Sequence, residues 1–533
     1  MQAIDSVSGR AKPCHGIVSS RVGTAALLLL ATVACGGPRP TASSATAGPA
    51  APTASAAVAP EVSGLHLATL RLIGELRSPL WLELYVSDVK GTAAAAKDVE
   101  QLLREYERAG KGRVKLAVHR VGKDVAAEAA REAGVVEIGE YPPEELGFLG
   151  LTLRYEAQRG VIPSFPLEGS TGLEFWITNK LRELRDLAEQ RQHRIGVVTG
   201  KGEIKLSEPA LTPRGSSNPN LQSILYQAFP FYVFVPVDLK DGKSAVDPGL
   251  DGLIITQPGH DYELAELQRV DQFLLLGNKS LAVFASAVNV TPASPQLQGS
   301  LDSHGLETLL RGYGVELEAD VLWDHASAFK LDVMKEGGGR ATFRYPLIPI
   351  VSSDPRAPAT GALDASSVPF FRLERLAFPH ASSLRLVTDQ QPADVKLRGI
   401  ARTSDETVST RKTPVNLRPA PTYPRGEMQS HLLAATVQGR LRSAFPVKLA
   451  NGNLVPVARA PSRVLVIASS TYLTNPFVYA DSSTNSDPLL VGLQQPYLSN
   501  ITATIVSLKN TLDWMLAADD FVELSATIVP RSP

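Results

Sequence analysis

A repeated alternation of short apolar runs and helical patterns between Arg194 and Ala285 constrains the fold of this chain more than any other feature. The helical patterns cover Leu221–Phe229 and Glu263–Gly277. The apolar runs, rich in β-branched residues, are Arg194–Gly202, Tyr232–Leu239, Asp251–Gly259 and Ser280–Ala287. Buried strands that alternate with helices predict a parallel sheet covered by helices. Ligands of such sheets usually bind in the loops at the carboxyl edge.

Length and charge set the broad class. A chain of 533 residues is too long for one ordinary core, so we expect two or three domains. The 53 basic and 54 acidic residues nearly cancel and create no field that would attract nucleic acid. We therefore expect no nucleic-acid partner.

Both cysteines, Cys14 and Cys35, lie at the start of the chain. The rest of the chain therefore has no disulfide framework, no cysteine-ligated metal site and no thiol nucleophile. Basic residues precede the apolar run Val22–Ala34, which is shorter than the roughly 20 residues of a spanning helix. Thr32–Gly36 (TVACG) then resembles a bacterial lipobox, although Thr32 stands where leucine is usual.

This pattern predicts a signal peptide over residues 1–34, a lipidated Cys35 and a membrane-anchored lipoprotein of the bacterial cell envelope, facing the periplasm or the exterior. The alternatives are an ordinary signal peptide and an uncleaved anchor. Residues 36–64 are rich in Ala, Pro, Ser and Thr, and with Cys35 they form the predicted tether of residues 35–64. As a flexible coil this tether would span on the order of 30 Å.

Residues 65–191 are predicted to form a first α/β domain. Its expected helices are Leu67–Leu76, Ala93–Ala109, Ala126–Ala133 and Leu173–Arg191. Its expected strands are Leu80–Ser87, Arg113–Val121, Leu146–Tyr155 and Gly160–Phe165. After the first helix, the order β-α-β-α-β-β-α, with Pro142-Pro143 before the third strand, resembles a thioredoxin-like fold. Because the domain has no Cys-x-x-Cys motif, we expect no redox activity.

Residues 192–533 are predicted to form a second domain with a parallel sheet of the amidotransferase- or flavodoxin-like kind. A helix over Leu301–Arg311 and a strand over Val315–Asp324 are expected next, followed by a proline-rich loop over Phe343–Pro358. Residues 340–460 indicate an irregular β-rich insertion with short strands at Ser383–Thr388 and Asp394–Ile400. The sheet pattern returns at Ser462–Thr474, and a last helix is expected over Ser499–Leu516.

Several stretches in colinear order resemble the GldG-like auxiliary components of ABC transport systems related to gliding motility. These stretches are Leu65–Ser87, Asp98–Val118, Arg194–Glu203, Asp251–Phe284, Leu306–Asp324, Gly439–Pro446, Arg463–Asn475 and Thr511–Asp520. The resemblance implies an extracytoplasmic α/β subunit beside an ABC permease and its ATPase, with no catalytic residues to carry over. The family usually has a spanning helix at each end, where this chain has a lipobox-like segment and a terminus soon after Asp520.

Two loops of the predicted sheet edge are candidate ligand-binding loops. Gly200, Lys201 and Gly202 could hold an anion at a helix N-terminus, with Lys201 supplying the charge. They match neither a Walker A nor a GxGxxG motif, and a tight turn that needs glycine explains them as well. His260 and Asp261 follow the third strand, where Asp261 is also expected to cap the next helix.

We expect no metal and no cofactor. The histidines are scattered and show no H-x-x-x-H or H-E-x-x-H spacing. The one metal alternative is that Asp324 and His325 approach His304 in space.

The leading hypothesis is a non-catalytic, membrane-tethered auxiliary or recognition subunit of an ABC-type export or gliding-related system. One alternative is a free-standing envelope lipoprotein that binds a partner or polymer. The other is a hydrolase at the sheet edge that uses Lys201, His260 and Asp261, although no G-x-S-x-G motif accompanies them.

Overall fold

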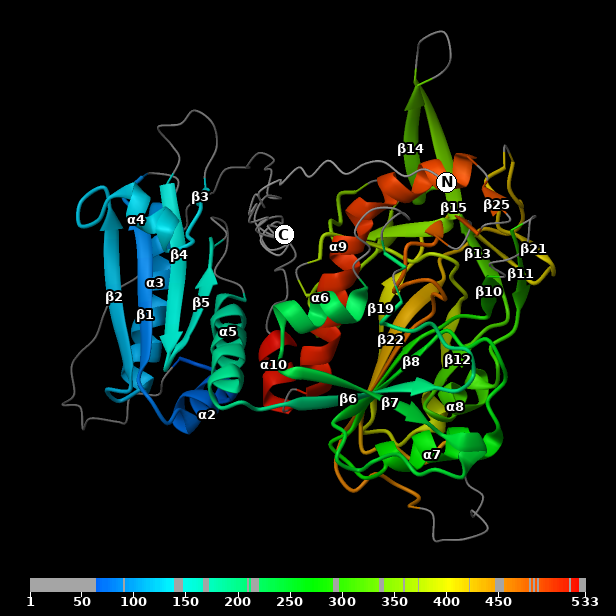
Figure 1. Cartoon of the computed structure of the whole chain (residues 1–533), viewed down its shortest axis with the longest axis horizontal. Coiled ribbons are helices and arrows are strands. Elements are labelled where there is room, and N and C mark those ends of the chain that lie inside the picture. The colour runs from blue at the N-terminus through cyan, green and yellow to red at the C-terminus, as the bar shows by residue number, and fades with distance from the viewer. Residues whose placement is uncertain are drawn as a thin grey trace, which may run out of the picture. The chain divides into compact units, whose positions relative to one another are not determined.

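The computed structural model describes residues 64–526, with breaks at 90–91, 139–146, 166–171, 209, 212–219, 291–296, 335–339, 358–359, 372, 421, 446–454, 479–480, 483–484, 487 and 517–518. These residues belong to one unit, residues 60–533, and form a mixed α/β fold (Figure 1). The predictions for residues 1–63 lie outside the described part of the chain.

The first sheet has five strands, in the order β2-β1-β4-β3 with β5 also paired to β4. Only β1 and β2 are parallel; the other pairs are antiparallel. Its strands are β1 (Leu80–Ser87), β2 (Val114–Val121), β3 (Glu137–Ile138), β4 (Gly147–Tyr155) and β5 (Gln158–Ile162). Its helices are α2 (Leu67–Glu75), α3 (Ala93–Ala109), α4 (Ala127–Glu132) and α5 (Leu173–Ala188). The elements expected for this region are therefore present, with β3 in addition.

Alternating side chains divide this sheet into two different faces. Leu80, Leu82 and Leu84 of β1 join a core with α3 and α5, because alternate residues of a strand point to one side. In α3, Val99, Leu103 and Tyr106 are buried at the spacing of one helix face. Among the described residues, the opposite face of the sheet is covered by α4 at one end only, where a small cluster includes Tyr85, Ala130, Ala133, Val135 and Phe148.

The second large sheet has nine strands, in the order β12-β18-β22-β23-β9-β8-β6-β7 with β19 also paired to β22. Its parallel part is β6 (His193–Thr199), β7 (Tyr232–Asp238), β8 (Gly252–Thr256), β9 (Ser280–Phe284) and β23 (Ser462–Ile467). Its antiparallel part is β12 (Val315–Leu317), β18 (Leu384–Leu386), β19 (Lys396–Arg402) and β22 (Leu432–Gly439). A wholly parallel sheet is thus a wrong prediction, because the segment expected as an insertion supplies β18, β19 and β22.

Helices cover both faces of the nine-stranded sheet. On one face, α6 (Leu221–Ala228) and α9 (Pro488–Leu516) share a core with Ile195 and Ile254. On the other, α7 (Leu264–Leu274) and α8 (Leu306–Gly312) pack on Leu253 and Ile255. The alternating inward and outward residues of β8 explain this two-sided burial, since all its residues are buried.

Smaller sheets and short helices complete the described fold. Two of these sheets are β10 (Val288–Val290), β11 (Gln298–Leu301) and β21 (Val415–Asn416), and β13 (Val321–Asp324) with β20 (Thr407–Thr410). The others are β14 (Ala328–Met334), β15 (Arg340–Ser352), β16 (Gly361–Ala362) and β17 (Arg375–Ala377), and β24 (Asp481–Ser482) with β25 (Asn485–Ser486). The remaining elements are η3 (Lys240–Gly242), η4 (Val368–Phe370), η5 (Thr388–Gln390) and α10 (Asp519–Ala526).

Four boundaries differ from the sequence-based expectation. The loop expected over Phe343–Pro358 is strand β15 up to Ser352; its prolines 346 and 349 lie at a register shift, where fewer ladder N–H groups are needed. The helix expected from Leu301 begins at Leu306, because Leu301 ends β11 and Gly305 has φ +84°. The strand Val315–Asp324 is split between two sheets, and α9 begins before Pro496 rather than after it.

Among the described residues, no helix combines the length and apolar character that crossing a bilayer requires.

Candidate functional site

The candidate site is the edge of the nine-stranded sheet where β6, β8, β9 and β23 end. Parallel strands aligned in register bring their following loops together at this edge. It is the usual position for ligands in such sheets. The predicted residues Gly200–Gly202 and His260–Asp261 both lie in these loops.

The glycine loop after β6 is a compact turn against the loop after β8. Gly200 and Gly202 have φ of +119° and +74°, a backbone conformation that favours glycine. The N–H of Gly259 donates to the Lys201 carbonyl over 2.8 Å. Buried Glu203 closes the turn by accepting from the Lys201 N–H at 2.8 Å and from the Tyr262 hydroxyl at 2.7 Å. The turn itself therefore explains why glycine occupies positions 200 and 202, without a bound ligand.

Lys201 is already engaged by carboxylates. Its Nζ lies 3.1 Å from Glu266 and 3.3 Å from Asp241. Desolvation lowers the pKa of Lys201, but its hydrogen bonds to Glu266 and Asp241 outweigh that effect and leave the pKa above the ordinary value. An anion at this point would have to compete with two protein carboxylates for the ammonium group.

The nearest helix N-terminus is also filled by a carboxylate. Helix α7 is capped by Glu263, whose N–H donates to Glu266 Oε2 over 2.9 Å in a capping box. The prediction that Asp261 caps this helix is therefore wrong. The chain stays extended for two further residues, and Asp261 faces another loop instead.

Asp261 lies beside His304, from the loop before α8. The Asp261 Oδ1 to His304 Nδ1 distance is 2.7 Å, and Asp302 Oδ1 lies 3.9 Å from the same nitrogen. Donor atoms of these three residues lie within 4.8 Å of one another, a spacing that could surround a cation. Both aspartates are exposed, however, and Asp302 also accepts a hydrogen bond from the His304 backbone N–H. A surface ion-pair cluster therefore explains the arrangement equally well.

The alternative metal pair Asp324 and His325 does not reach His304. Asp324 is buried and accepts hydrogen bonds from Ser327 and Ser404. His325 Nε2 lies 2.9 Å from the Pro424 carbonyl oxygen. Both residues thus serve the local structure around β13.

Buried His380 is a residue of this edge that the sequence did not single out. It has φ +52°, and its Nδ1 lies 2.9 Å from the Thr471 hydroxyl oxygen, in the loop after β23. The backbone carbonyl of His380 accepts from Ser286 Oγ, in the loop after β9. Burial lowers the pKa of His380 to about 4. Since His380 and Thr471 are each only 2% exposed, this imidazole–hydroxyl pair joins loops and is closed to a substrate.

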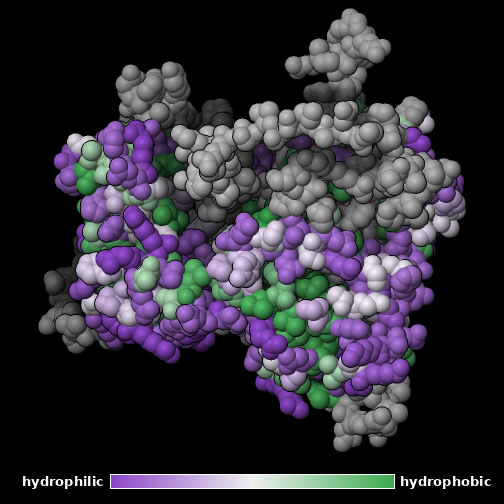
Figure 2. Space-filling model, in the orientation of Figure 1, coloured by the Kyte–Doolittle hydropathy of each residue, from purple (hydrophilic) through white to green (hydrophobic). Residues whose placement is uncertain are grey.

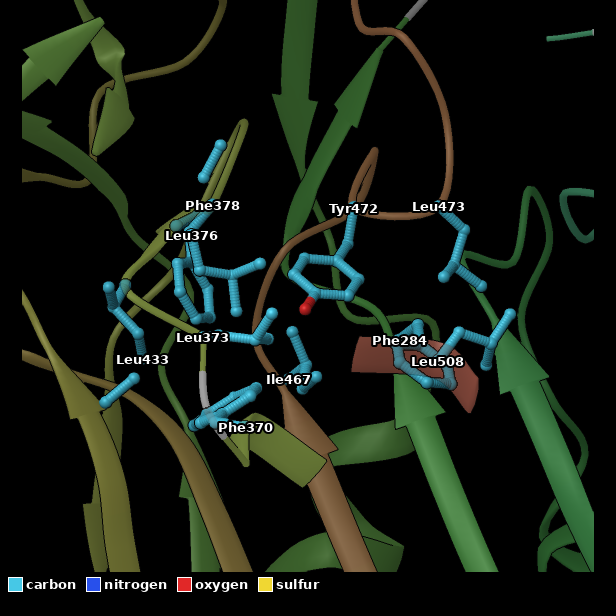
Figure 3. Packing of buried hydrophobic residues seen from close by; sticks show 14 of the residues in the cluster. Phe284, Phe370, Leu373, Leu376, Phe378, Leu433, Ile467, Tyr472, Leu473 and Leu508 are labelled. Atoms are coloured by element: carbon cyan, nitrogen blue, oxygen red, sulfur yellow. The ribbon is translucent and has the colours of Figure 1, made fainter. Parts of the chain in front are cut away.

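An apolar cluster fills the middle of the edge, above the ends of β9 and β23. Figure 3 shows Tyr472 between Phe284 and Phe378, with Phe370, Leu373 and Leu376 from the 340–460 segment beside them. The rings of Phe284 and Tyr472 are stacked, with centroids 5.7 Å apart. The Tyr472 hydroxyl donates to Ser507 of α9 over 2.7 Å. The position at which related sheets bind ligands is here occupied by the chain's own side chains.

A buried charge cluster joins α5 to α9 on one face of the sheet. Asp513 lies 2.7 Å from Arg182 Nη2 and 2.6 Å from Lys509 Nζ, and it also accepts from the Tyr232 hydroxyl of β7. Lys509 contacts Glu183 of α5 as well, at 2.6 Å. The sequence signal was the i, i+4 pair Lys509 and Asp513 on an otherwise apolar helix face.

The cluster keeps its charges. Burial raises the pKa of Glu183, but Lys180 and Lys509 outweigh it and bring the pKa down to about 2. For Lys509, desolvation lowers the pKa, and Asp513 and Glu183 raise it above the ordinary value by a larger amount. Glu183 and Lys509 therefore pair as ions and connect α5 to α9.

The predicted hydrolase residues do not form a catalytic arrangement with one another. Within the described residues, no hydrogen bond joins Lys201, His260 or Asp261 to a Ser, Thr or Cys side chain. Lys201 faces Glu266 whereas Asp261 faces His304.

The described residues thus form a mixed α/β protein in which side chains of the chain itself fill the sheet edge above β9 and β23. The sequence profile of an ABC-type uncharacterized transport system matches residues 192–497, more than half of the chain. The chain belongs to this family of transport-system auxiliary components. No curated protein matches the sequence.

Replacement of Lys201, His260 and Asp261 by alanine together is expected to leave the rate of hydrolysis of model substrates the same as in wild type. Asp261 makes a surface ion pair, which contributes little to stability. Lys201 is only 15% exposed and pairs with buried Glu266, so its replacement should lower the unfolding temperature without removing an exposed surface. The variant and wild type would be compared for thermal unfolding and for hydrolysis of model ester, phosphate and glycoside substrates. A wild-type hydrolytic activity that the triple variant loses would support the enzyme alternative.

Proposed function

We propose that this protein is a non-catalytic, GldG-like auxiliary subunit of an ABC-type transport system, tethered to a bacterial membrane and exposed outside the cytoplasm. The family match over residues 192–497 supports the association with a transport system. Its partners would be the permease and ATPase subunits of that system.

The observation that carries the non-catalytic part of the proposal is the filled sheet edge. Phe378 and Tyr472 occupy the place above β9 and β23, and the polar groups around them bond to one another. An enzyme of this architecture keeps room there for a substrate and aims its reactive groups into it. A closed edge suits a protein that presents its outer surfaces to a partner.

The exposed side chains around the second sheet supply such surfaces. Tyr226 of α6 is 63% exposed and Met428, near β20, is 45% exposed. Strand β7 is an outer strand of the nine-stranded sheet and carries Pro236, a residue that edge strands tolerate. The side chains of Tyr226 and Met428 do not contribute to a buried core, so they are available to a partner.

The tethering part of the proposal rests on sequence. The basic residues before Val22–Ala34 and the lipobox-like Thr32–Gly36 support cleavage before Cys35 and acylation of its thiol. The following tether would give the folded part access to a membrane-embedded permease.

Co-purification tests the proposal. Wild-type protein and a Cys35→Ala variant would be isolated from detergent-solubilised membranes of the native organism and the bound proteins identified. We expect wild type to recover the permease and ATPase, and Cys35→Ala to leave the membrane fraction, fail to label with a fatty-acid probe and lose most of the recovered partners.

The outcomes separate the parts of the proposal. Recovery of no transport subunit by anchored wild type would contradict the auxiliary role and favour a free-standing lipoprotein. Unchanged fractionation of Cys35→Ala would instead mean that the apolar segment Val22–Ala34 is the anchor.

A further inference from the structure

An exposed tryptophan lies on the face of the five-stranded sheet that, among the described residues, only α4 covers in part. Trp81 points away from the core that takes Leu80 and Leu82, because side chains alternate along β1. It is 41% exposed, one of the few large apolar side chains that the described fold leaves in solvent. Helix α4 covers only the other end of this face, at Tyr85 and Phe148.

Strand register places cations on both sides of Trp81. Lys115 of β2 and Arg154 of β4 are its direct cross-strand partners. Arg159 of β5 is in turn the partner of Arg154. All three cations are exposed, and the Arg154 guanidinium lies 5.2 Å from the centroid of the indole ring. We call these four residues the basic row; at strand spacing it extends over about 14 Å.

The cations of the basic row have no carboxylate partner among the described residues. Elsewhere on this sheet and its helices, the cations of Arg104, Arg120, Lys123 and Arg131 all form ion pairs. The acidic residue nearest in register is Glu83, which accepts from the Thr152 hydroxyl over 3.2 Å. The row therefore presents a net positive charge on a chain whose total charge is −1. On the side of the molecule that Figure 2 shows, hydrophilic residues make up most of the described surface.

The positive charge of the basic row favours an anionic ligand. Because the row is extended over about 14 Å, it fits a membrane surface better than a small molecule. Arg154 already covers part of the indole, so a ring-shaped ligand would find little of it free for stacking. Interfacial phosphates need only accessible cations, and an indole edge is well suited to the headgroup region. The predicted tether ends at Gly64, and only the nine-residue helix α2 and a short connection separate it from β1.

We propose that the face carrying Trp81, Lys115, Arg154 and Arg159 lies on an anionic phospholipid surface. The proposal rests on the membrane tethering put forward above. The tether brings the folded part to the bilayer, and the basic row determines which face it turns towards the lipid. Three cations at about fivefold each would favour anionic over neutral lipid by on the order of 100-fold at low ionic strength.

Fluorescence quenching by lipid measures this contact. Detergent-purified full-length protein would be reconstituted into vesicles of brominated phosphatidylcholine, with and without phosphatidylglycerol. Trp323 and Trp514 are buried and Trp176 is half-buried, so subtracting the signal of a Trp81→Phe variant isolates Trp81. We expect strong quenching of Trp81 in anionic vesicles, little in neutral vesicles, and loss of the difference at about 1 M salt, where screening is short-ranged.

Matched charge variants complete the test. Lys115→Ala, Arg154→Ala and Arg159→Ala together should reduce quenching in anionic vesicles to the neutral level. Lys97→Ala, Arg104→Ala and Lys111→Ala, which remove the same charge from α3 and the turn after it, should leave quenching unchanged. Equal effects of the two triple variants, or equal quenching in both lipids, would overturn the proposal. Anchored protein whose Trp81 is quenched in neither lipid would overturn it too and would favour an acidic protein as the occupant.

The quenching measurement and the co-purification experiment can fail independently. The vesicles contain no permease or ATPase, so a failed co-purification leaves this measurement intact. Protein that stays in solution with both kinds of vesicle would overturn the tethering and this inference together.

Discussion

Replacement of Asp513 by alanine is expected to cost about 3–5 kcal/mol of unfolding free energy, because it leaves buried charges without their partner. Asp513 is only 2% exposed and contacts Arg182, Lys509 and Tyr232. Lys509 keeps Glu183, whereas Arg182 loses its carboxylate partner. Urea unfolding followed by circular dichroism measures the loss.

Two further variants make the Asp513 result interpretable. Asp513→Asn retains a hydrogen-bond acceptor for Tyr232 and should lose less than alanine does. Asp88→Ala removes an exposed carboxylate paired with Lys123 and should leave the unfolding free energy nearly unchanged. If Asp513→Ala costs no more than Asp88→Ala, the cluster does not stabilise the fold.

Lowering the pH is expected to reduce the unfolding free energy because of buried His380. Its pKa in the folded protein is about 4, because the imidazole is buried, against about 6.5 in the unfolded chain. Below pH 6.5 the unfolded chain binds a proton that the folded chain does not, so the unfolding free energy falls as the pH drops. The contribution is complete above about pH 6.5 and should decline by about 3 kcal/mol on approach to pH 4.

Unfolding between pH 7.5 and 4 checks this dependence. His380→Gln should flatten the curve over this range, although burial also lowers the pKa of His431, which leaves a smaller slope of the same sign. The matched control is His260→Gln, an exposed histidine of the same sheet edge, which should reproduce the wild-type curve. A His380→Gln curve as steep as wild type would mean that His380 is not the group responsible.

The sequence was sufficient to predict a helix or strand wherever its apolar residues recur at the spacing typical of that element. The helix Ala93–Ala109 and the strand Leu80–Ser87 have the predicted bounds, because apolar spacing and flanking residues mark both ends. Four parallel strands between His193 and Phe284 also match their apolar runs. The specific likeness to thioredoxin- and flavodoxin-like folds stays a prediction.

Pairing between distant segments could not be predicted in the same way. Strand β22, Leu432–Gly439, contains small and polar residues and becomes buried only because β23 and β19 lie beside it. The helix expected over Ser499–Leu516 begins earlier, at Pro488, and α9 continues through Pro496. In both places tertiary packing outweighs the local preference.

The candidate site was located by topology but not by its chemistry. The carboxyl edge does bring Gly202 and Gly259 together, as parallel strands require. What fills that edge comes from Phe378, His380 and Tyr472, far along the chain. No spacing in the sequence relates these residues to Gly202.

The central place of β23 determines the order in which the large sheet can be assembled during synthesis. This strand pairs Arg463 with Ser280 on one side and with Gln438 on the other, so it joins the parallel and antiparallel halves. Until residue 467 has left the ribosome, the nascent chain holds two partial sheets whose apolar edges have no neighbour. Contacts of such long sequence separation form slowly, and unpaired edges invite aggregation. Chains interrupted before β23 should therefore be cleared or aggregate, while the five-stranded sheet is complete long before.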